Sequence, residues 1–355
     1  FKWPRMTPGL RAGLAAALDG LICVYKPADL SIMALKRTIT KRIAAHANAV
    51  VGWPQISSIK MPVIEEHESG ALVVVGTRKQ KNYSEHPLVI GEEWRVEDIR
   101  IEELRPMETS SSGICVFGIN GGVDELPPLR AKHWCSSHRV EAIMGRETDK
   151  HEIKGKVVHR EEFAHVTRHK LQKQLDRIKH DYRRVAFEMA EVDIQSSKAY
   201  SLAVRGIPRP QLPNAQLIAD LQLASFRPPY FALQIRSVGE TDAYLRCLIT
   251  EIGRELGSAA SPARVIRRMT GPFRVEHALL ERQLSVQNIV DNVKMMKEAV
   301  RDFNYDPEVI NEPTRDPSEA AVQHRKDVFD RMVANELQQP DEFDAMRPAW
   351  PREYA

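Results

Sequence analysis

The chain has 355 residues, of which 43% are hydrophobic and 28% charged; this composition excludes wholesale disorder and fits one large folded body with additions, or two to three domains. No apolar run of about 18 residues is present, so no membrane helix is predicted. Net charge is +3, but residues 301–355 hold 7 Lys and Arg against 13 Asp and Glu, whereas residues 1–300 hold 44 against 35. The basic body favours binding to a polyanion, and the acidic tail favours binding to a protein. The alternative is that these charges form solvated faces without a partner.

The cysteines and the first residues indicate the compartment. Four cysteines are scattered along the chain without the spacing of zinc ligands, which predicts a reducing compartment and no structural metal. The chain begins at Phe1, and residues 1–11 carry Lys2, Arg5 and Arg11 but no acid. This start resembles a mature mitochondrial protein after removal of a presequence, although a truncated start would look the same.

Strands and helices alternate in the first half of the predicted structure. Apolar runs bounded by Gly, Pro and Ser indicate strands at 20–25, 71–76, 94–101, 113–119, 138–144 and 156–158. Apolar residues at helical spacing predict helices over 9–18 and 30–45, the second with Ser31 as its N-cap. Residues 46–70 lack either pattern and are predicted to be irregular.

Helices dominate the predicted second half, and a different segment ends the chain. Helices are expected over 167–179, 200–204, 242–252, 276–281 and 286–303, with strands at 186–193 and two more within 214–238. The tail is rich in proline around one amphipathic helix at 318–337. We divide the chain into a lead-in of residues 1–19, a body of 20–300 and an acidic arm of 301–355. The arm either contacts a partner surface or folds back on the body.

Five sequence blocks, taken together and in chain order, resemble the motifs of a known protein family. They are 20–27 (GLICVYKP), 86–89 (HPLV) leading to 112–118, 145–149 (GRETD) continuing to 155–168, 199–206 (AYSLAVRG) and 244–279. Together they resemble the TruB family of RNA pseudouridine synthases, in particular its mitochondrial members without a PUA domain. The resemblance implies an α+β fold with a mixed central sheet flanked by helices, here with an extended C-terminal arm. It also implies isomerisation of a flipped uridine without any cofactor or metal.

Three positions of this sequence match the catalytic positions that the resemblance implies. The carboxylate position, four residues before Ser112, holds Glu108 instead of the family's Asp, and the position of the stacking Tyr holds His138. The pocket cation matches Arg246. Glutamate is longer by one methylene, about 1.5 Å, and a displacement of about 1 Å can cost on the order of 100-fold in rate.

Each of these positions has two interpretations. Glu108 is either a displaced nucleophile or a loop acid without a pocket role, and the second is favoured. His138 either stacks a base or is an ordinary surface histidine on a strand. Arg246 either lines the pocket or pairs with a neighbour on its helix. Two departures from the family pattern in separate blocks favour lost activity.

Basic residues near the same cleft are predicted to bind RNA, although each could instead be a solvated surface charge. They are Lys26, Lys132, Arg139, Arg146, Lys156, Arg160, Arg264, Arg267 and Arg268. Trp134, next to Lys132, is either a stacking platform or a half-buried core residue.

The resulting hypothesis is a catalytically inactive RNA-binding protein of the mitochondrial matrix. It would be a structural component of a ribonucleoprotein, the mitochondrial ribosome foremost, contacting mitochondrial rRNA through its body and ribosomal or other proteins of the particle through its arm, and no membrane. One alternative is an active synthase that uses Glu108. Another is an assembly factor that leaves the finished particle.

Overall fold

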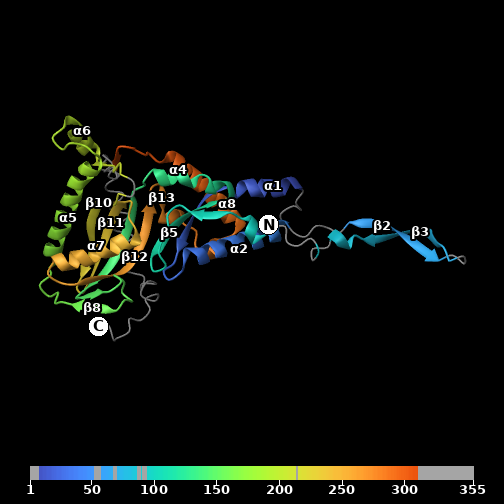
Figure 1. Cartoon of the computed structure of the whole chain (residues 1–355), viewed down its shortest axis with the longest axis horizontal. Coiled ribbons are helices and arrows are strands. Elements are labelled where there is room, and N and C mark those ends of the chain that lie inside the picture. The colour runs from blue at the N-terminus through green and yellow to red at the C-terminus, as the bar shows by residue number, and fades with distance from the viewer. Residues whose placement is uncertain are drawn as a thin grey trace, which may run out of the picture.

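A mixed sheet forms the centre of the body (Figure 1). In this computed structural model, residues 8–51, 57–66, 70–85, 89, 94–212 and 215–310 are described. Within them, an eight-stranded sheet has the order β1-β5-β12-β6-β11-β10, with β4 added beside β5 and β13 beside β12. The strands are β1 (Gly20–Lys26), β4 (Ile101–Glu103), β5 (Ser112–Ile119), β6 (Ser136–Met144), β10 (Leu217–Arg227), β11 (Tyr230–Val238), β12 (Ala260–Thr270) and β13 (Phe273–Arg274). β5 and β12 run parallel and the other paired neighbours run antiparallel, so the predicted mixed α+β fold is confirmed.

Helices cover the sheet and join it to smaller elements. The α-helices are α1 (Pro8–Ala17), α2 (Ile32–Val51), α4 (Leu126–Ala131), α5 (Arg168–Met189), α6 (Ser197–Arg205), α7 (Asp242–Glu255) and α8 (Val286–Asp302). Short 3-10 helices lie at Tyr83–Glu85, Val96–Asp98, Asn120–Val123, Val275–His277 and Glu281–Gln283. Small two-stranded pairs join β2 (Ser58–Glu66) to β3 (Leu72–Lys81), β7 (Arg146–Thr148) to β8 (Val157–Arg160), and β9 (Ile207–Pro208) to β14 (Val309–Ile310).

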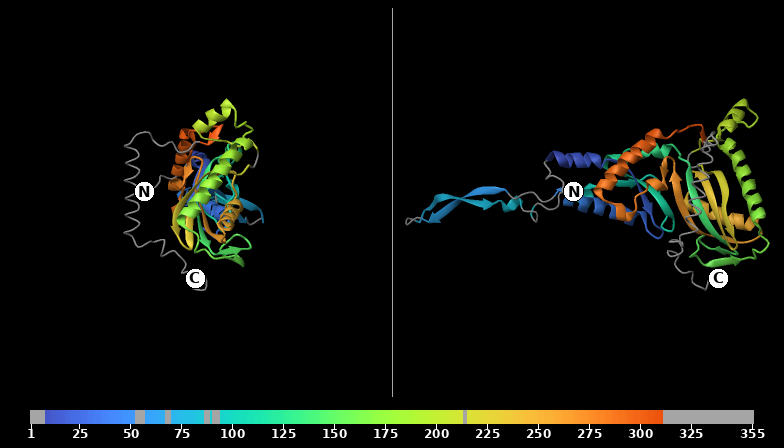
Figure 2. Two further views of the ribbon diagram at one scale, coloured as in Figure 1. Left: turned by 90° about the vertical axis from the view of Figure 1, so that its left-hand side faces the viewer. Right: turned by 180° about the vertical axis from the view of Figure 1, so that it is seen from behind.

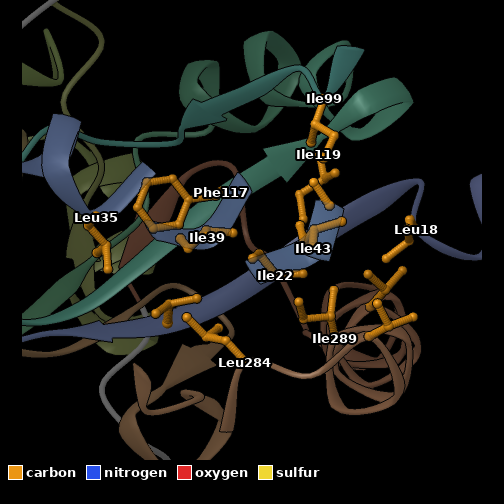
Figure 3. Packing of buried hydrophobic residues seen from close by; sticks show 14 of the residues in the cluster. Leu18, Ile22, Leu35, Ile39, Ile43, Ile99, Phe117, Ile119, Leu284 and Ile289 are labelled. Atoms are coloured by element: carbon orange, nitrogen blue, oxygen red, sulfur yellow. The ribbon is translucent and has the colours of Figure 1, made fainter. Parts of the chain in front are cut away.

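The largest apolar core lies where α2 and α8 meet β1 and β5 (Figure 3). Ile39 and Ile43 of α2 are fully buried in it together with Phe117 of β5. The spacing of four residues between the two isoleucines places them on one helical face, as the sequence predicted. Ser31 caps this helix by accepting a hydrogen bond from the N–H of Ala34 at 3.1 Å. A second core packs α5 and α7 against β6, β10, β11 and β12.

The sequence analysis predicted one strand that is not formed and missed another that is, and both errors have local causes. Residues 186–193 were predicted as a strand, but α5 continues to Met189 because Tyr182 and Ala186 extend the buried stripe of this helix. Strand β12 was missed altogether, since Pro262 and three arginines obscure its apolar pattern. The ladder with β6 has a register shift between Pro262 and Arg264, which is where a sheet tolerates proline.

Three further boundaries also differ from the predictions. Of the residues 46–70 predicted to be irregular, those up to Val51 belong to α2 and those from Ser58 to Glu66 form β2. The strand expected at 94–101 is a 3-10 helix followed by β4, and the helix expected at 276–281 is replaced by two 3-10 helices. The predicted helix at 318–337 and the motif at 86–88 lie outside the described residues.

The first residues assigned to the arm belong structurally to the body. Phe303 and Tyr305 contact the ring of Trp134 edge-on, with centroid distances of 5.2 and 5.4 Å. β14 then pairs with β9. The body therefore continues to Ile310, beyond the predicted boundary at residue 300.

The paired strands β2 and β3, which we call the β2–β3 ribbon, project away from the body along its longest axis (Figure 1). Figure 2 shows the same projection from behind. The residues of both strands are exposed.

Candidate active site and its loop

A buried lysine binds the backbone of the loop between β4 and β5. The ammonium of Lys26, at the end of β1, lies 3.1 Å from the carbonyl oxygens of Pro27 and Thr109 and 2.5 Å from that of Ser111. Lys26 is fully buried, and this burial lowers the pKa of its ammonium. Its charge is therefore used to position the loop, and the prediction that Lys26 contacts RNA does not fit its burial.

The same loop is held from the side by Asp242 and Arg267. The N–H of Glu108 donates to Oδ2 of Asp242 at 2.7 Å, and Nη2 of Arg267 donates to the carbonyl oxygen of Pro106 at 2.8 Å. Nη2 of Arg267 also lies 4.0 Å from Oδ1 of Asp242. Both side chains are almost fully buried, so these contacts have little competition from water. The backbone around Glu108 is thus fixed at both ends of the loop.

Arg246 brings together the exposed acids of the site. Its Nη2 pairs with the carboxylate of Glu108. Its Nη1 lies 3.3 Å from Oγ of Ser110 and 3.3 Å from a carboxylate oxygen of Glu152, which in turn accepts a hydrogen bond from Ser110 at 2.9 Å. The side chain of Arg246 is 10% exposed, whereas those of Glu108 and Glu152 are 43% and 32% exposed. A nearly buried guanidinium therefore orients two carboxylates that solvent and ligands can reach.

Two acidic residues of this site were missed by the sequence analysis. Glu152 follows the GRETD block, and nothing in its local pattern marks it as a neighbour of Arg246. Asp242 lies one helical turn before Arg246 on α7 and was predicted only to open that helix. Its carboxylate is 4% exposed and is engaged by Glu108 and Arg267, so it has a positioning role.

His138 lies beneath the site with no exposed surface. Its Nε2 is 3.9 Å from Oε1 of Glu240, which also pairs with Arg105 at 3.3 Å. Burial lowers the pKa of His138 well below its ordinary range, and the nearby Arg267 and Arg105 lower it further, so the imidazole is neutral. The prediction that His138 is a surface histidine is wrong. Because its imidazole ring is fully buried, neither face of the ring is accessible to a base in this structure.

The neutral state of His138 makes stability depend on pH. Below a pH of about 6.5 the unfolded chain binds a proton that the folded chain does not, so the free energy of unfolding decreases by roughly 1.4 kcal/mol per pH unit from this residue. We expect urea-unfolding series between pH 7 and pH 5 (roughly the window below the ordinary histidine pKa) to show this decrease for the wild type. In His138→Gln the decrease in the free energy of unfolding should be smaller by roughly 1.4 kcal/mol per pH unit. If both proteins show the same pH dependence of this free energy, His138 is not the neutral buried group that we infer.

The predicted RNA-contacting residues separate into buried and accessible groups. Arg146 and Arg267 are 5% exposed, which removes most of their surface from phosphate contact. Accessible or half-buried positions are Lys132, Arg139, Lys156, Arg160, Arg264 and Arg268. Arg139 and Arg264 both pair with Glu141, at 3.2 and 3.9 Å. The side chain of Trp134 is only 1% exposed. Both predictions for it, a stacking platform for a base and a half-buried core residue, are therefore wrong.

Two absences hold for the described residues, one of a candidate metal site and one of a membrane-spanning helix. They contain no group of three or more His, Cys, Asp or Glu side chains arranged to hold a metal ion. None of the helices described is long and apolar enough to cross a membrane.

Comparison with known proteins identifies the family. The model of the TruB family pseudouridylate synthase N-terminal domain matches residues 112–243. Pseudouridylate synthase TRUB2, mitochondrial, of Xenopus tropicalis is 30% identical over 313 residues, covering 87% of this chain and 96% of that protein. The Homo sapiens protein of the same name is 29% identical over 285 residues, covering 80% and 85%.

A comparison of folds gives a more distant match. A chain of the archaeal box H/ACA sRNP Nop10–Cbf5 complex aligns with a TM-score of 0.42 and 12% identity, covering 84% of this chain and 63% of its own length. This chain therefore spans less than two thirds of that solved chain. The similarity to the Xenopus protein, which extends over nearly its whole length, shows that the chain belongs to the TruB family of pseudouridine synthases.

Proposed function

We propose that this chain is an RNA-binding protein of the mitochondrial matrix whose pseudouridine synthase site has lost its activity. It acts as a structural component of a mitochondrial ribonucleoprotein, the mitochondrial ribosome, with mitochondrial rRNA as its ligand. The mitochondrial relatives support the compartment, and the family supports RNA as the ligand. The accessible cations Lys132, Lys156, Arg160 and Arg268 are the proposed phosphate contacts on the body.

The fixed backbone of the loop is the observation that carries the proposal. Asp242 holds the N–H of Glu108, and Lys26 holds the carbonyl oxygens of Thr109 and Ser111. Because these contacts are buried, the backbone cannot retreat to compensate for the extra methylene of glutamate. The carboxylate is displaced by about 1.5 Å relative to that of an aspartate, which is enough to lose on the order of 100-fold or more in rate. The absence of an exposed ring at His138 removes base stacking as well.

Restoring the family residues tests this argument. Purified wild type and the variants Glu108→Asp, His138→Tyr and their combination are incubated with uridine-containing rRNA, and pseudouridine is quantified by mass spectrometry. We expect no turnover by the wild type and measurable turnover by the double variant. Glu108→Gln combined with His138→Tyr is the control, because it keeps the new ring but lacks the carboxylate. Turnover by the wild type that disappears in Glu108→Ala would refute the proposal.

The alternative of an active synthase has one specific observation in its favour. The carboxylate of Glu108 is 43% exposed and paired with Arg246, as a positioned nucleophile would be. Glu152→Ala separates the roles of the two acids in the same assay. Activity that survives in this variant but not in Glu108→Ala selects Glu108 as the catalytic group.

An assembly factor is distinguished by its association with the particle. A structural component remains with ribosomal subunits in sucrose gradients at high salt, whereas an assembly factor dissociates from them. The proposed protein contacts of the arm concern residues 311–355, which lie outside the described structure. Deletion of these residues is expected to weaken association with the particle without reducing RNA affinity of the body.

A further inference from the structure

Within the described part of the structure, the β2–β3 ribbon has both of its faces exposed. All residues of β2 and β3 are accessible, and the ribbon extends beyond the end of α2 in both orientations (Figures 1 and 2). With ten residues, β3 is roughly 33 Å long. A lone two-stranded hairpin is marginally stable in water, so the ribbon gains stability from any surface that it meets.

The end of the ribbon nearest the body is cationic on one face. The register pairs Lys60 with Lys79 and Ser58 with Lys81, and alternation places these side chains on the same face. Side chains in such opposed pairs are about 5 Å apart at Cβ, and like charges in this arrangement destabilise the strand pair. The carboxylates of Glu65 and Glu66 cannot offset this repulsion, because they lie roughly 17 Å or more along the strand from Lys60.

Exposed cations also lie on the first half of α2. Arg37 and Lys41 lie on one exposed side of α2, and Arg42 is exposed beside them. α2 itself runs from Ile32 to Val51, and β2 of the ribbon begins at Ser58. The second half of α2, residues 43–51, carries no Lys or Arg, so the cations of α2 and the lysines of the ribbon are two separate positive regions.

We propose that Lys60, Lys79 and Lys81 bind the phosphate backbone of a structured RNA outside the catalytic cleft. The inference rests on the proposed RNA-binding function and adds a second contact site to it. Charge complementarity favours RNA over protein here, because an opposed pair of ammonium groups needs counter-charge and each nucleotide supplies a phosphate. The distal half of the ribbon has a different character, with Ile64, Leu72 and Val74 exposed, and its apolar side chains would suit a protein surface.

The test compares two triple variants with the same change of charge. Lys60→Gln/Lys79→Gln/Lys81→Gln removes the cationic end of the ribbon. Lys198→Gln/Lys294→Gln/Lys297→Gln removes three exposed lysines from α6 and α8 and is the control. Dissociation constants are measured for a stem–loop RNA, whose stem exceeds one helical turn, over a range of salt concentrations. We expect the ribbon variant to bind roughly 10-fold or more weakly at low salt, with a salt slope smaller by about 2, because up to three phosphate contacts are lost.

Further measurements make the outcomes distinct. Binding of single-stranded oligouridine, which we assign to the candidate site on the body, should be the same in the ribbon variant and the wild type. An equal loss of stem–loop affinity in both triple variants would overturn the proposal. So would unchanged RNA binding combined with loss of a protein partner from mitochondrial extracts. Failure of the wild type to bind any RNA would instead remove the proposed function, and this inference with it.

Discussion

Replacing Lys26 with methionine is expected to lower the free energy of unfolding by about 3 kcal/mol or more. The ammonium is the partner of three carbonyl oxygens, those of Pro27, Thr109 and Ser111. Methionine fills a similar volume but donates no hydrogen bond, so these buried acceptors lose their partner. Each unsatisfied buried acceptor costs roughly 1–3 kcal/mol, although relaxation of the loop recovers part of the loss. Urea unfolding followed by circular dichroism measures the change.

Lys36→Met is the matched control for this variant. Lys36 forms an ion pair with Glu103, but both side chains are about one quarter exposed, at 25% and 26%. Ion pairs between side chains exposed to this extent contribute less than about 1 kcal/mol. The two variants should therefore differ by at least about 2 kcal/mol. Equal losses would show that the ammonium of Lys26 does not organise the loop.

Replacing Gly113 with alanine should be more damaging still, with an expected loss of about 4 kcal/mol or more. Gly113 lies at φ +120° in β5, and a Cβ atom added there would be 2.1 Å from the carbonyl oxygen of Arg267 and 2.6 Å from its nitrogen. These are backbone atoms of β12, which pairs in parallel with β5 at this position. Relief of the clash requires the two central strands to separate, and the positive φ adds strain.

Gly76→Ala on β3 is the control for Gly113→Ala, because no heavy atom lies within 4 Å of the added Cβ. It should change stability by no more than about 1 kcal/mol. Soluble yield and thermal unfolding are compared for the two proteins. If Gly113→Ala is recovered only as aggregate while Gly76→Ala folds normally, the expectation holds. A melting temperature of Gly113→Ala equal to that of the wild type would contradict the close approach of β5 and β12.

Much of the fold could be predicted because its local patterns are strong. The spacing of Ile39 and Ile43 indicated α2, and the helix expected from residue 167 is α5, where Thr167 is the N-cap and accepts a hydrogen bond from the N–H of Lys170. β12 could not be predicted in this way. Its arginines are accommodated by contacts with segments distant in sequence, as Arg267 is by Pro106 of the β4–β5 loop and Asp242 of α7, and such contacts have no signature along the chain.

The candidate site shows the same division. The spacing to Ser112 identified Glu108, and the block at 244–279 identified Arg246; the structure pairs the two side chains. Glu152 and Asp242 were not identified, because their roles depend on the meeting of the segment after β7 and the start of α7 with the β4–β5 loop. Lys26 was assigned to RNA because charge is read from sequence without burial, and burial reverses its role.

The sequence by itself determined the family, the order of most helices and strands, and the acid that lies four residues before Ser112. These properties depend on residue type and on spacing along the chain, and both are visible without coordinates. Only the tertiary structure decided that the loop around Glu108 is immobilised by Lys26 and Asp242, that His138 is enclosed, and that the β2–β3 ribbon is exposed. Burial and long-range contact arise when distant segments pack together, and those determine which charges bind the protein's own backbone and which remain for a ligand.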